Sequence, residues 1–321
     1  GKLPGLANLL LHGCPVSNDA KEDALRNGAL TSALLHPVAV GMMRHAKPGF
    51  LVSPGSRSEQ SSWPVSLERA MLHVAHMPAS ERPHVVIVQA ESFCDVREFV
   101  AEEYRDQFRN FLPNWDKLKK KSGTLPTIDN AFGAYTMRME FKVLTGLCEK
   151  TLGSLAFNPY LLAARRPLWS LARHFSSCGY ASICLHPYHR KFFRRDKVMP
   201  NLGFDAFHAL PELERLEKFG PYASDAALAA ELKRILSESD KPVFCFCITV
   251  EAHGPWLEGR LTEAQIAETL PDLDYRKFSP AIQMYLCHLR HMDDFLGMLM
   301  NDNSRETFVW AYGDHPPSLD W

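Results

Sequence analysis

HVVIVQAES, at residues 84–92, is the stretch that decides the fold. Its first seven residues are almost continuously apolar and β-branched, which is typical of a strand buried on both faces of a sheet. Similar runs predict further strands at residues 181–185, 242–250 and 307–312. Segments with apolar residues at helical spacing separate these runs. The alternation predicts an α/β domain with a central, mainly parallel sheet flanked by helices.

Five of the intervening segments are expected to be helices. They are residues 113–121, a helix that begins near Thr136, and residues 167–178, 224–236 and 279–300. The last of these carries an apolar stripe of a core helix, so its Asp293 and Asp294 are expected to be surface or structural polar groups. The basic run Lys119 to Lys121 is interpreted as a solvated helix face.

Composition excludes some classes of function. The 321 residues are 46% apolar, which is enough for a sizeable core, and the net charge is −1. A neutral chain argues against a nucleic-acid binder that depends on bulk electrostatics. No apolar run approaches the roughly 18 to 20 residues that span a bilayer, and the start has no signal peptide. Because the chain opens on Gly1, we expect it to be a piece of a longer protein.

The eight cysteines contain no CxxC pair, which argues against a zinc knuckle or a thioredoxin-like site. Most are expected to be buried small apolar groups, although an even number permits disulfides in an oxidising compartment. Residues 48–64 are rich in Pro, Ser and Gly and are expected to be an exposed linker.

The segment FGAYTMRMEFKVLTGL, at residues 132–147, places the hydroxyl group of Thr136 at a probable helix start. Free backbone N–H groups and the positive end of the helix dipole favour an anion such as phosphate there. A threonine in this position is far more often a helix cap than a nucleophile. A catalytic role therefore requires a base or a metal that activates the hydroxyl group.

Polar residues follow four of the predicted strands at or just beyond their carboxyl ends. They are Glu91, His186, His253 and the pair Asp314 and His315. In parallel α/β sheets the carboxyl ends meet at one rim, where ligands bind, so these residues are expected to converge.

The predicted group suits metal-assisted phosphoryl transfer. Glu91, Asp314 and His315 offer oxygen and imidazole ligands for one divalent ion, Zn²⁺ or Mn²⁺, and Thr136 as a fourth ligand would have its hydroxyl pKa lowered. Attack by Thr136 on a phosphodiester would give a phospho-threonine intermediate. Arg195, in a basic stretch at residues 186–197 that is predicted to be a loop, would stabilise the phosphoryl charge. His186 and His253 would bind non-bridging oxygens or protonate the leaving alcohol.

At these residues the sequence resembles the lipoteichoic acid synthase branch of the alkaline phosphatase and sulfatase superfamily. The matching motifs span residues 84–317 in order: VIVQAESF at 86–93, LPNWDKL at 112–118, TMRMEFKVLTGL at 136–147, HPYHRKFFRRD at 186–196, PNLGFDAF at 200–207, VEAHGPW at 250–256 and WAYGDHPP at 310–317.

The resemblance implies a phosphoglycerol transferase with an alkaline phosphatase/sulfatase-like fold. Its metal site would be Glu91, Thr136, Asp314 and His315, with Thr136 as the nucleophile. His186, Phe193, Arg195 and His253 would hold the phosphoglycerol head group. The donor would be phosphatidylglycerol and the acceptor a cell-envelope glycan or polymer.

The resemblance also implies a place in the cell and a division of the chain. The enzyme would belong to the cell inner membrane, tethered by helices absent from this chain, with its catalytic domain periplasmic or extracytoplasmic. Residues 1–80 would be the stem after those helices, and residues 81–321 the catalytic domain, truncated if the family's usual C-terminal elements are missing. Eight cysteines favour a Gram-negative, periplasmic relative.

Several alternatives stay open at this level. Phe193 stands where the family often has Trp, and a phosphoethanolamine transferase would use the same metal and Thr136. A non-catalytic, glycan-binding relative would keep the fold without needing a transition metal. A sulfatase is disfavoured, because the only similar segment, SPGSR at residues 53–57, has the wrong order. The head group, acceptor, native metal, disulfide pairing and oligomeric state are not determined by the sequence.

Overall fold

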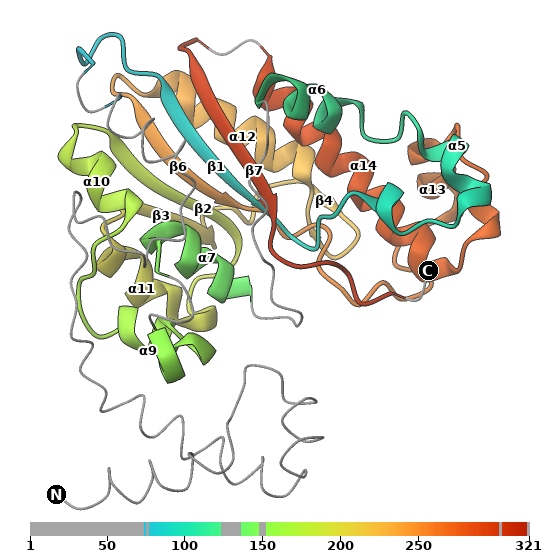
Figure 1. Cartoon of the computed structure of the whole chain (residues 1–321), viewed down its shortest axis with the longest axis horizontal. Helices are drawn as coiled ribbons and strands as arrows, with labels where there is room; N and C mark the ends of the chain where they lie inside the picture. Colours follow the sequence, from blue (N-terminus) through green and yellow to red (C-terminus); the bar gives the residue numbers. More distant parts are fainter. Residues whose placement is uncertain (1–73, 75–76, 123–135, 148–151, 302–303, 320–321) are drawn as a thin grey trace, which may run out of the picture.

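The structure is a computed structural model that describes residues 74, 77–122, 136–147, 152–301 and 304–319. Its centre is a five-stranded sheet in the order β3-β2-β6-β1-β7, and every pair of neighbours is parallel (Figure 1). The strands are β1 (His84–Ala90), β2 (Ala181–His189), β3 (Ala206–Leu210), β6 (Val243–Ile248) and β7 (Thr307–Gly313). A small antiparallel pair, β4 (Lys218–Phe219) and β5 (Tyr222–Ala223), lies outside the main sheet. The predicted α/β class with a mainly parallel sheet is confirmed.

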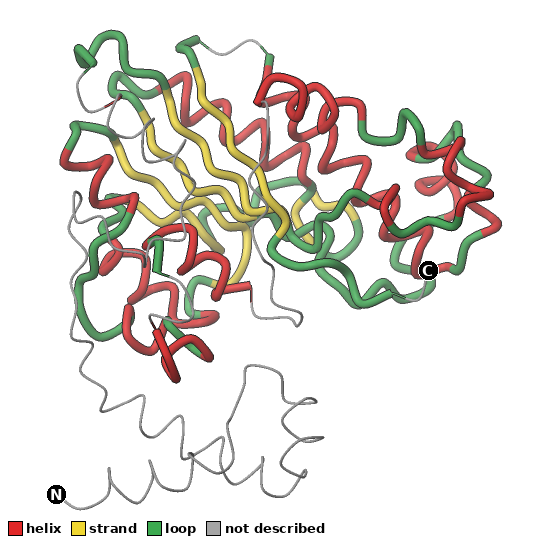
Figure 2. Tube along the Cα trace, in the orientation of Figure 1, coloured by secondary structure: helices red, strands yellow, loops and turns green. Residues whose placement is uncertain are grey.

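Helices cover both faces of the sheet (Figure 2). One layer contains α6 (Pro113–Ser122), α12 (Asp225–Glu238) and α14 (Pro280–Met300), and the other contains α7 (Thr136–Thr145), α9 (Tyr160–Ala163), α10 (Leu171–Ser177) and α11 (Arg195–Leu202). Shorter elements are η1 (Val96–Glu98), η2 (Glu102–Tyr104), α5 (Arg105–Phe108), η3 (Gly153–Phe157), η4 (Phe192–Arg194), α13 (Glu263–Thr269) and η5 (Tyr275–Lys277). None of the helices in this described part combines the length and apolarity needed to cross a membrane.

The two-sided burial of the sheet explains its apolar strands. Every residue of β1 and of β6 is buried. Alternate side chains of β1 enter different cores: Val86 and Val88 pack with α12 and α14, whereas Val85 and Ile87 pack with the layer that contains α7 and α10. Because side chains alternate across a strand, a strand covered on both faces must be apolar at every position.

The segment after β2 differs from its sequence-based interpretation. The basic run at residues 186–197 is predicted to be a loop, but β2 continues to His189, and α11 begins at Arg195. Strand β3 was not predicted, because its five residues, AFHAL, carry only a short alternating pattern. The consequence is that Arg195 sits on a rigid element rather than on a solvated loop.

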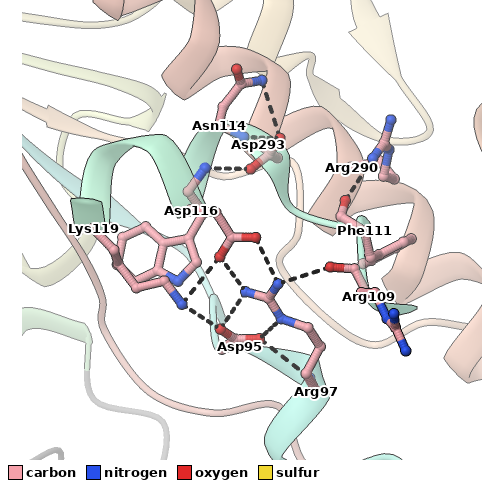
Figure 3. Close-up of polar contacts among 10 residues, drawn as sticks. Asp95, Arg97, Arg109, Phe111, Asn114, Asp116, Lys119, Arg290 and Asp293 are labelled. Carbon is pink, nitrogen blue, oxygen red and sulfur yellow. Dashed lines mark hydrogen bonds and ion pairs between the residues drawn. The ribbon is translucent and has the colours of Figure 1, made fainter. Parts of the chain in front are cut away.

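An ion-pair network ties the loop after β1 to α6 (Figure 3). Arg97 donates to both carboxylate oxygens of Asp95 and of Asp116, at 2.7–2.8 Å. Lys119 pairs with the same two carboxylates at 3.0 and 3.3 Å. Lys119 is therefore ion-paired and only partly exposed, whereas Lys120 and Lys121 are exposed, as expected of a solvated helix face. The network fixes α6 beside the segment that follows β1.

Asp293 of α14 caps the start of α6. Its carboxylate accepts hydrogen bonds from the backbone N–H groups of Asn114 (3.0 Å) and Trp115 (2.7 Å), and from the Asn114 side chain (3.1 Å). These N–H groups belong to the first turn of a helix, where they have no intrahelical acceptor. Asp293 is therefore a structural group, and it is buried rather than exposed.

We expect Asp293→Ala to lower the free energy of unfolding by about 2 kcal/mol, because it removes a helix cap and leaves buried N–H groups unpaired. Urea unfolding followed by circular dichroism measures the change. Asp294→Ala, at the exposed neighbouring position, is the matched control and should change stability by less than about 0.5 kcal/mol. Equal stability of the two variants would contradict the capping role.

Candidate active site

The adjacency of β1 and β7 brings the first two site residues together. Ala90 is paired with Gly313, so Glu91 and Asp314 leave the sheet side by side, and the Asp314 N–H group donates to the Ala90 carbonyl at 3.2 Å. A Cβ atom at Gly313 would lie 1.9 Å from the carbonyl oxygen of Phe93. Only glycine therefore allows this close crossing of the two chains.

Ser92 holds Glu91 in place through a strained turn. Its φ is 53°, in the left-handed region that non-glycine residues rarely adopt. Its N–H group donates to Asp314 Oδ1 (2.8 Å), its hydroxyl group to Glu91 Oε1 (2.8 Å), and its carbonyl accepts from the Tyr285 hydroxyl group (2.7 Å). Such strain persists only where surrounding contacts over-determine it, and it clusters at functional sites.

Glu91, Asp314 and His315 form a candidate metal site. One ligand atom from each lies within 4.8 Å of the others. His315 Nε2 lies 3.4 Å from Asp314 Oδ2 and 3.6 Å from Glu91 Oε1. Its Nδ1 donates to the Pro316 carbonyl at 3.0 Å, which leaves Nε2 as the lone-pair nitrogen facing the carboxylates. The adjacent carboxyl ends of β1 and β7 thus bring the three predicted ligands close together.

The electrostatics of this group fit a cation. Asp314 is buried, and its Oδ2 has no hydrogen-bond partner among the described residues. Burial, and then the nearby charge of Glu91, raise the pKa of Asp314 to about 7. Burial also raises the pKa of Glu91, although His315 opposes this shift. Two buried carboxyl groups with an unpaired oxygen are costly without a positive partner, and a divalent ion held by carboxylate and imidazole ligands would supply it.

Thr136 lies beside the same carboxyl group. It is the first residue of α7, as the sequence predicts, and it is half-buried. Its hydroxyl group is close enough to Asp314 for hydrogen bonding to lower that carboxyl's pKa. The helix start and the three candidate ligands therefore converge, and Thr136 is placed to be a fourth ligand.

Arg195 enters the site through a buried ion pair that sequence analysis did not identify. Its Nε donates to Glu140 Oε2 at 3.0 Å, its Nη2 donates to Glu140 Oε1, and both side chains are almost fully buried. Glu140 lies one helical turn after Thr136 and also accepts from the Tyr160 hydroxyl group. The only signal in the sequence was the EF pair four residues after Thr136.

The orientation of Arg195 leaves one donor for a ligand. Its Nη1 is buried and has no hydrogen-bond partner in the described part of the chain. Its positive charge opposes the rise that burial causes in the pKa of Glu91, and it adds to the lowering that burial causes in the pKa of His186. An unpaired guanidinium donor beside the candidate metal site suits an anionic oxygen.

The two predicted histidines also reach this region. His186 lies within β2, and burial, followed by the charge of Arg195, lowers its pKa well below the usual range, so the ring is neutral. Its Nδ1 donates to the Ile248 carbonyl at 3.1 Å. His253 follows β6, and its Nδ1 donates to the Gly254 carbonyl at 2.7 Å. In both rings the geometry leaves Nε2 for other partners.

Phe193 covers Arg195. The guanidinium carbon of Arg195 lies 5.2 Å from the centroid of the Phe193 ring. Phe193 and Arg194 both have left-handed backbones, with φ of 52° and 59°. The predicted head-group residues Phe193 and Arg195 are thus in direct contact.

The loop that carries His253 is fixed from both sides by residues that the sequence did not single out for this role. Arg260 donates to the backbone carbonyls of Glu251 (2.6 Å) and His253 (2.6 Å). The buried Glu251 carboxylate accepts from His288 and His291 of α14, at 2.8 and 3.0 Å. These contacts link residues up to 40 positions apart, so no local pattern indicates them.

We expect the affinity for a divalent ion to rise with pH up to about 7, because the metal must displace the proton held by Asp314. Affinity should fall about tenfold for each pH unit below this value. The free energy of unfolding of the metal-free protein should change in the opposite direction. Asp314 binds a proton more tightly in the native state than in the unfolded state, so this free energy should fall as pH rises from the pKa of Asp314 in the unfolded chain towards 7. Chelator competition for Mn²⁺ or Zn²⁺ measures the affinity. A flat profile between about pH 5 and about pH 7 would contradict this linkage.

Comparison with known proteins identifies the class to which this fold and site belong. The sulfatase family model matches residues 83–321, and the chain belongs to the sulfatase family.

Two proteins of Rhizobium meliloti (strain 1021) are similar in sequence. The putative cyclic beta-1,2-glucan modification protein is 31% identical over 255 residues, covering 74% of this chain and 36% of that protein. The capsular polysaccharide biosynthesis protein RkpI is 34% identical over 263 residues, covering 78% and 44%. The chain thus spans less than half the length of either relative.

Two solved structures share the fold. The lipoteichoic acid synthase LtaP from Listeria monocytogenes matches with a TM-score of 0.57 and 18% identity, over 78% of this chain and 62% of that one. The Streptococcus pyogenes phosphoglycerol transferase GacH, solved in complex with sn-glycerol-1-phosphate, matches with a TM-score of 0.56 and 21% identity, over 85% and 72%. The expected alkaline phosphatase/sulfatase-like architecture is confirmed.

Proposed function

We propose that this chain is the catalytic domain of a metal-dependent transferase. It moves phosphoglycerol from phosphatidylglycerol to a cell-envelope glycan or polymer through a phospho-threonine intermediate. The observation that carries the proposal is the position of the Thr136 hydroxyl group beside the Glu91, Asp314 and His315 group. A hydroxyl nucleophile next to three metal-ligand side chains is the arrangement that phosphodiester chemistry needs.

In this proposal Glu91, Asp314, His315 and Thr136 would hold one divalent ion, Mn²⁺ or Zn²⁺. The chemistry that the ion would supply is a lower pKa of the Thr136 hydroxyl group, whose proton would pass to solvent. Thr136 Oγ1 then attacks the phosphorus atom of the lipid, and the bond from phosphorus to the diacylglycerol oxygen breaks. His253, which must enter this step as the imidazolium, donates its Nε2 proton to that oxygen and keeps its Nδ1–H on the Gly254 carbonyl.

The second half of the reaction reverses these roles. A hydroxyl group of the acceptor attacks the phosphorus atom of phospho-Thr136 and gives its proton to His253. The Thr136 oxygen leaves, and the phosphoglycerol group stays on the acceptor. Arg195 Nη1 donates to a non-bridging phosphoryl oxygen throughout, while Glu140 keeps the guanidinium in place.

A glycerol head group fits the charges of the site better than ethanolamine. The guanidinium carbon of Arg195 lies 5.2 Å from the centroid of the Phe193 ring. An ammonium head group would meet like charge there, whereas a neutral polyol would not.

The glycan acceptor is supported by the two Rhizobium meliloti relatives, whose names refer to a glucan and a capsular polysaccharide. A periplasmic domain tethered to the inner membrane, with residues 1–80 as its stem and 81–321 as its catalytic part, belongs to the same proposal.

The test is to incubate the purified chain and Mn²⁺ or Zn²⁺ with fluorescent phosphatidylglycerol and, separately, with fluorescent phosphatidylethanolamine. We expect release of diacylglycerol from phosphatidylglycerol and little from phosphatidylethanolamine. The reverse preference would establish the alternative, a phosphoethanolamine transferase. A chain that binds no transition metal and cleaves neither lipid would instead be the non-catalytic, glycan-binding relative.

A further inference from the structure

Three aromatic side chains from separate elements form a chain of ring contacts that reaches His253, and they are called the aromatic platform here. Tyr188 comes from β2, Phe192 from η4 and Tyr222 from β5. The Tyr188 ring lies 5.3 Å from Phe192 and 6.3 Å from Tyr222, between ring centroids. It stacks on His253 at 6.5 Å with an interplanar angle of 14°, and Tyr222 meets His253 edge-on at 5.7 Å.

The aromatic platform is not part of the protein core. None of its three residues belongs to either of the hydrophobic clusters of the described chain. Phe192 is 44% exposed, Tyr188 and Tyr222 are half-buried, and their hydroxyl groups make no hydrogen bond to another described residue. An exposed aromatic ring beside free hydroxyl groups is typical of ligand-binding surfaces.

The backbone beside the platform is strained. Phe193 and Arg194, directly after Phe192, adopt left-handed conformations, which cost about 1–2 kcal/mol per residue for L-amino acids. Arg195 then pairs with Glu140 and fixes the end of this turn. The strained turn therefore presents Phe192 outward next to Tyr188, instead of letting it pack into the core.

Positive charges select the kind of ligand that the platform can bind. The Arg260 guanidinium carbon lies 5.5 Å from the Tyr222 centroid, and that of Arg195 lies 5.9 Å from the Phe192 centroid. Arg260 is held there by backbone carbonyls of the His253 loop. A cationic ligand would be repelled from rings that already carry cations, whereas a neutral ring with hydroxyl groups would not.

We propose that the aromatic platform is an acceptor subsite that binds a pyranose ring of a neutral glycan. The C–H face of the sugar would lie on the exposed Phe192 ring, and its hydroxyl groups would bond to the Tyr188 and Tyr222 hydroxyl groups. This assignment rests on the proposed function, because it supplies the acceptor of that reaction. The platform adjoins His253, the residue that takes the acceptor's proton in the proposed reaction.

The experiment is a calorimetric titration of the metal-loaded chain with cyclic β-1,2-glucan as the probe. Phe192→Ala and Tyr222→Ala should each weaken binding at least about tenfold, which corresponds to 1.4 kcal/mol. Phe308→Ala is the matched control, because Phe308 has a similar exposure (45%) but lies near the amino end of the edge strand β7, whereas the site is at the carboxyl end. Its glucan affinity should stay within about twofold of wild type. Tyr222→Phe keeps the ring, so it should lie between wild type and Tyr222→Ala.

Two results would contradict the assignment of the aromatic platform as an acceptor subsite. One is unchanged glucan affinity in Phe192→Ala and Tyr222→Ala when their melting temperatures match wild type. The other is no glucan binding by the unsubstituted chain. Failure of the proposed function has a different signature, because the chain would then release no diacylglycerol from phosphatidylglycerol even while its glucan affinity still depended on Phe192 and Tyr222.

Discussion

Thr136→Ala is expected to reduce the release of diacylglycerol from phosphatidylglycerol by about 10⁴-fold or more, the scale of loss seen when a nucleophile is removed. The reason is chemical rather than structural. Thr136 is half-buried at the first position of α7, and alanine is a good helix former, so the fold should persist. Circular dichroism and the melting temperature verify that the variant is folded.

Thr136→Ser is the matched control for this substitution. Serine retains a hydroxyl group at the same place, so measurable turnover should remain, and a phosphoglycerol adduct should be detectable on that residue by mass spectrometry of the quenched enzyme. Full activity in Thr136→Ala, or an adduct on another residue, would rule out Thr136 as the nucleophile.

Asp314→Asn is expected to abolish both metal binding and turnover. The amide oxygen can still accept from the N–H groups of Ser92 and His315, which bond to Asp314 Oδ1 at 2.8 and 2.9 Å. The turn should therefore survive while the charge is lost. Since even outer-shell partners of a metal are worth about 10- to 100-fold in affinity, the loss of a direct ligand should exceed about 100-fold. Asp314→Ala should likewise lose the metal and turnover.

Metal content after dialysis, measured by inductively coupled plasma mass spectrometry, reports the first effect, and diacylglycerol release reports the second. Asp272→Ala removes an exposed carboxylate and should keep both properties. An Asp314→Asn protein that keeps one equivalent of metal would show that Asp314 is not a ligand. A protein that loses the metal but keeps its turnover would show that the metal has no part in the reaction.

Much of the fold could be predicted because its central strands are locally unambiguous. Residues 84–90 form β1 as predicted, since a strand covered on both faces must be apolar throughout. The convergence of Glu91, Asp314 and His315 could also be predicted, because the strands of the main sheet are parallel and β1 pairs with β7. The order of the strands, which makes those two neighbours, is not encoded in any local pattern.

The support around the site could not be predicted, because it depends on tertiary contacts. The pair of Glu140 and Arg195 joins residues 55 positions apart, and Tyr285 reaches Ser92 across 193 positions. Helix α11 was missed because a basic segment interrupted by Pro200 has weak helical character by itself. Packing against α9 and β3 overrides that local preference.

The most direct test of the account is a crystal structure of the Mn²⁺- or Zn²⁺-loaded chain, with anomalous data collected at the absorption edge of the metal. We predict a single anomalous peak at about 2.0–2.2 Å from Thr136 Oγ1, Glu91, Asp314 and His315 Nε2. A peak elsewhere, or a peak at this group with Thr136 Oγ1 well outside bonding distance, would contradict the central claim.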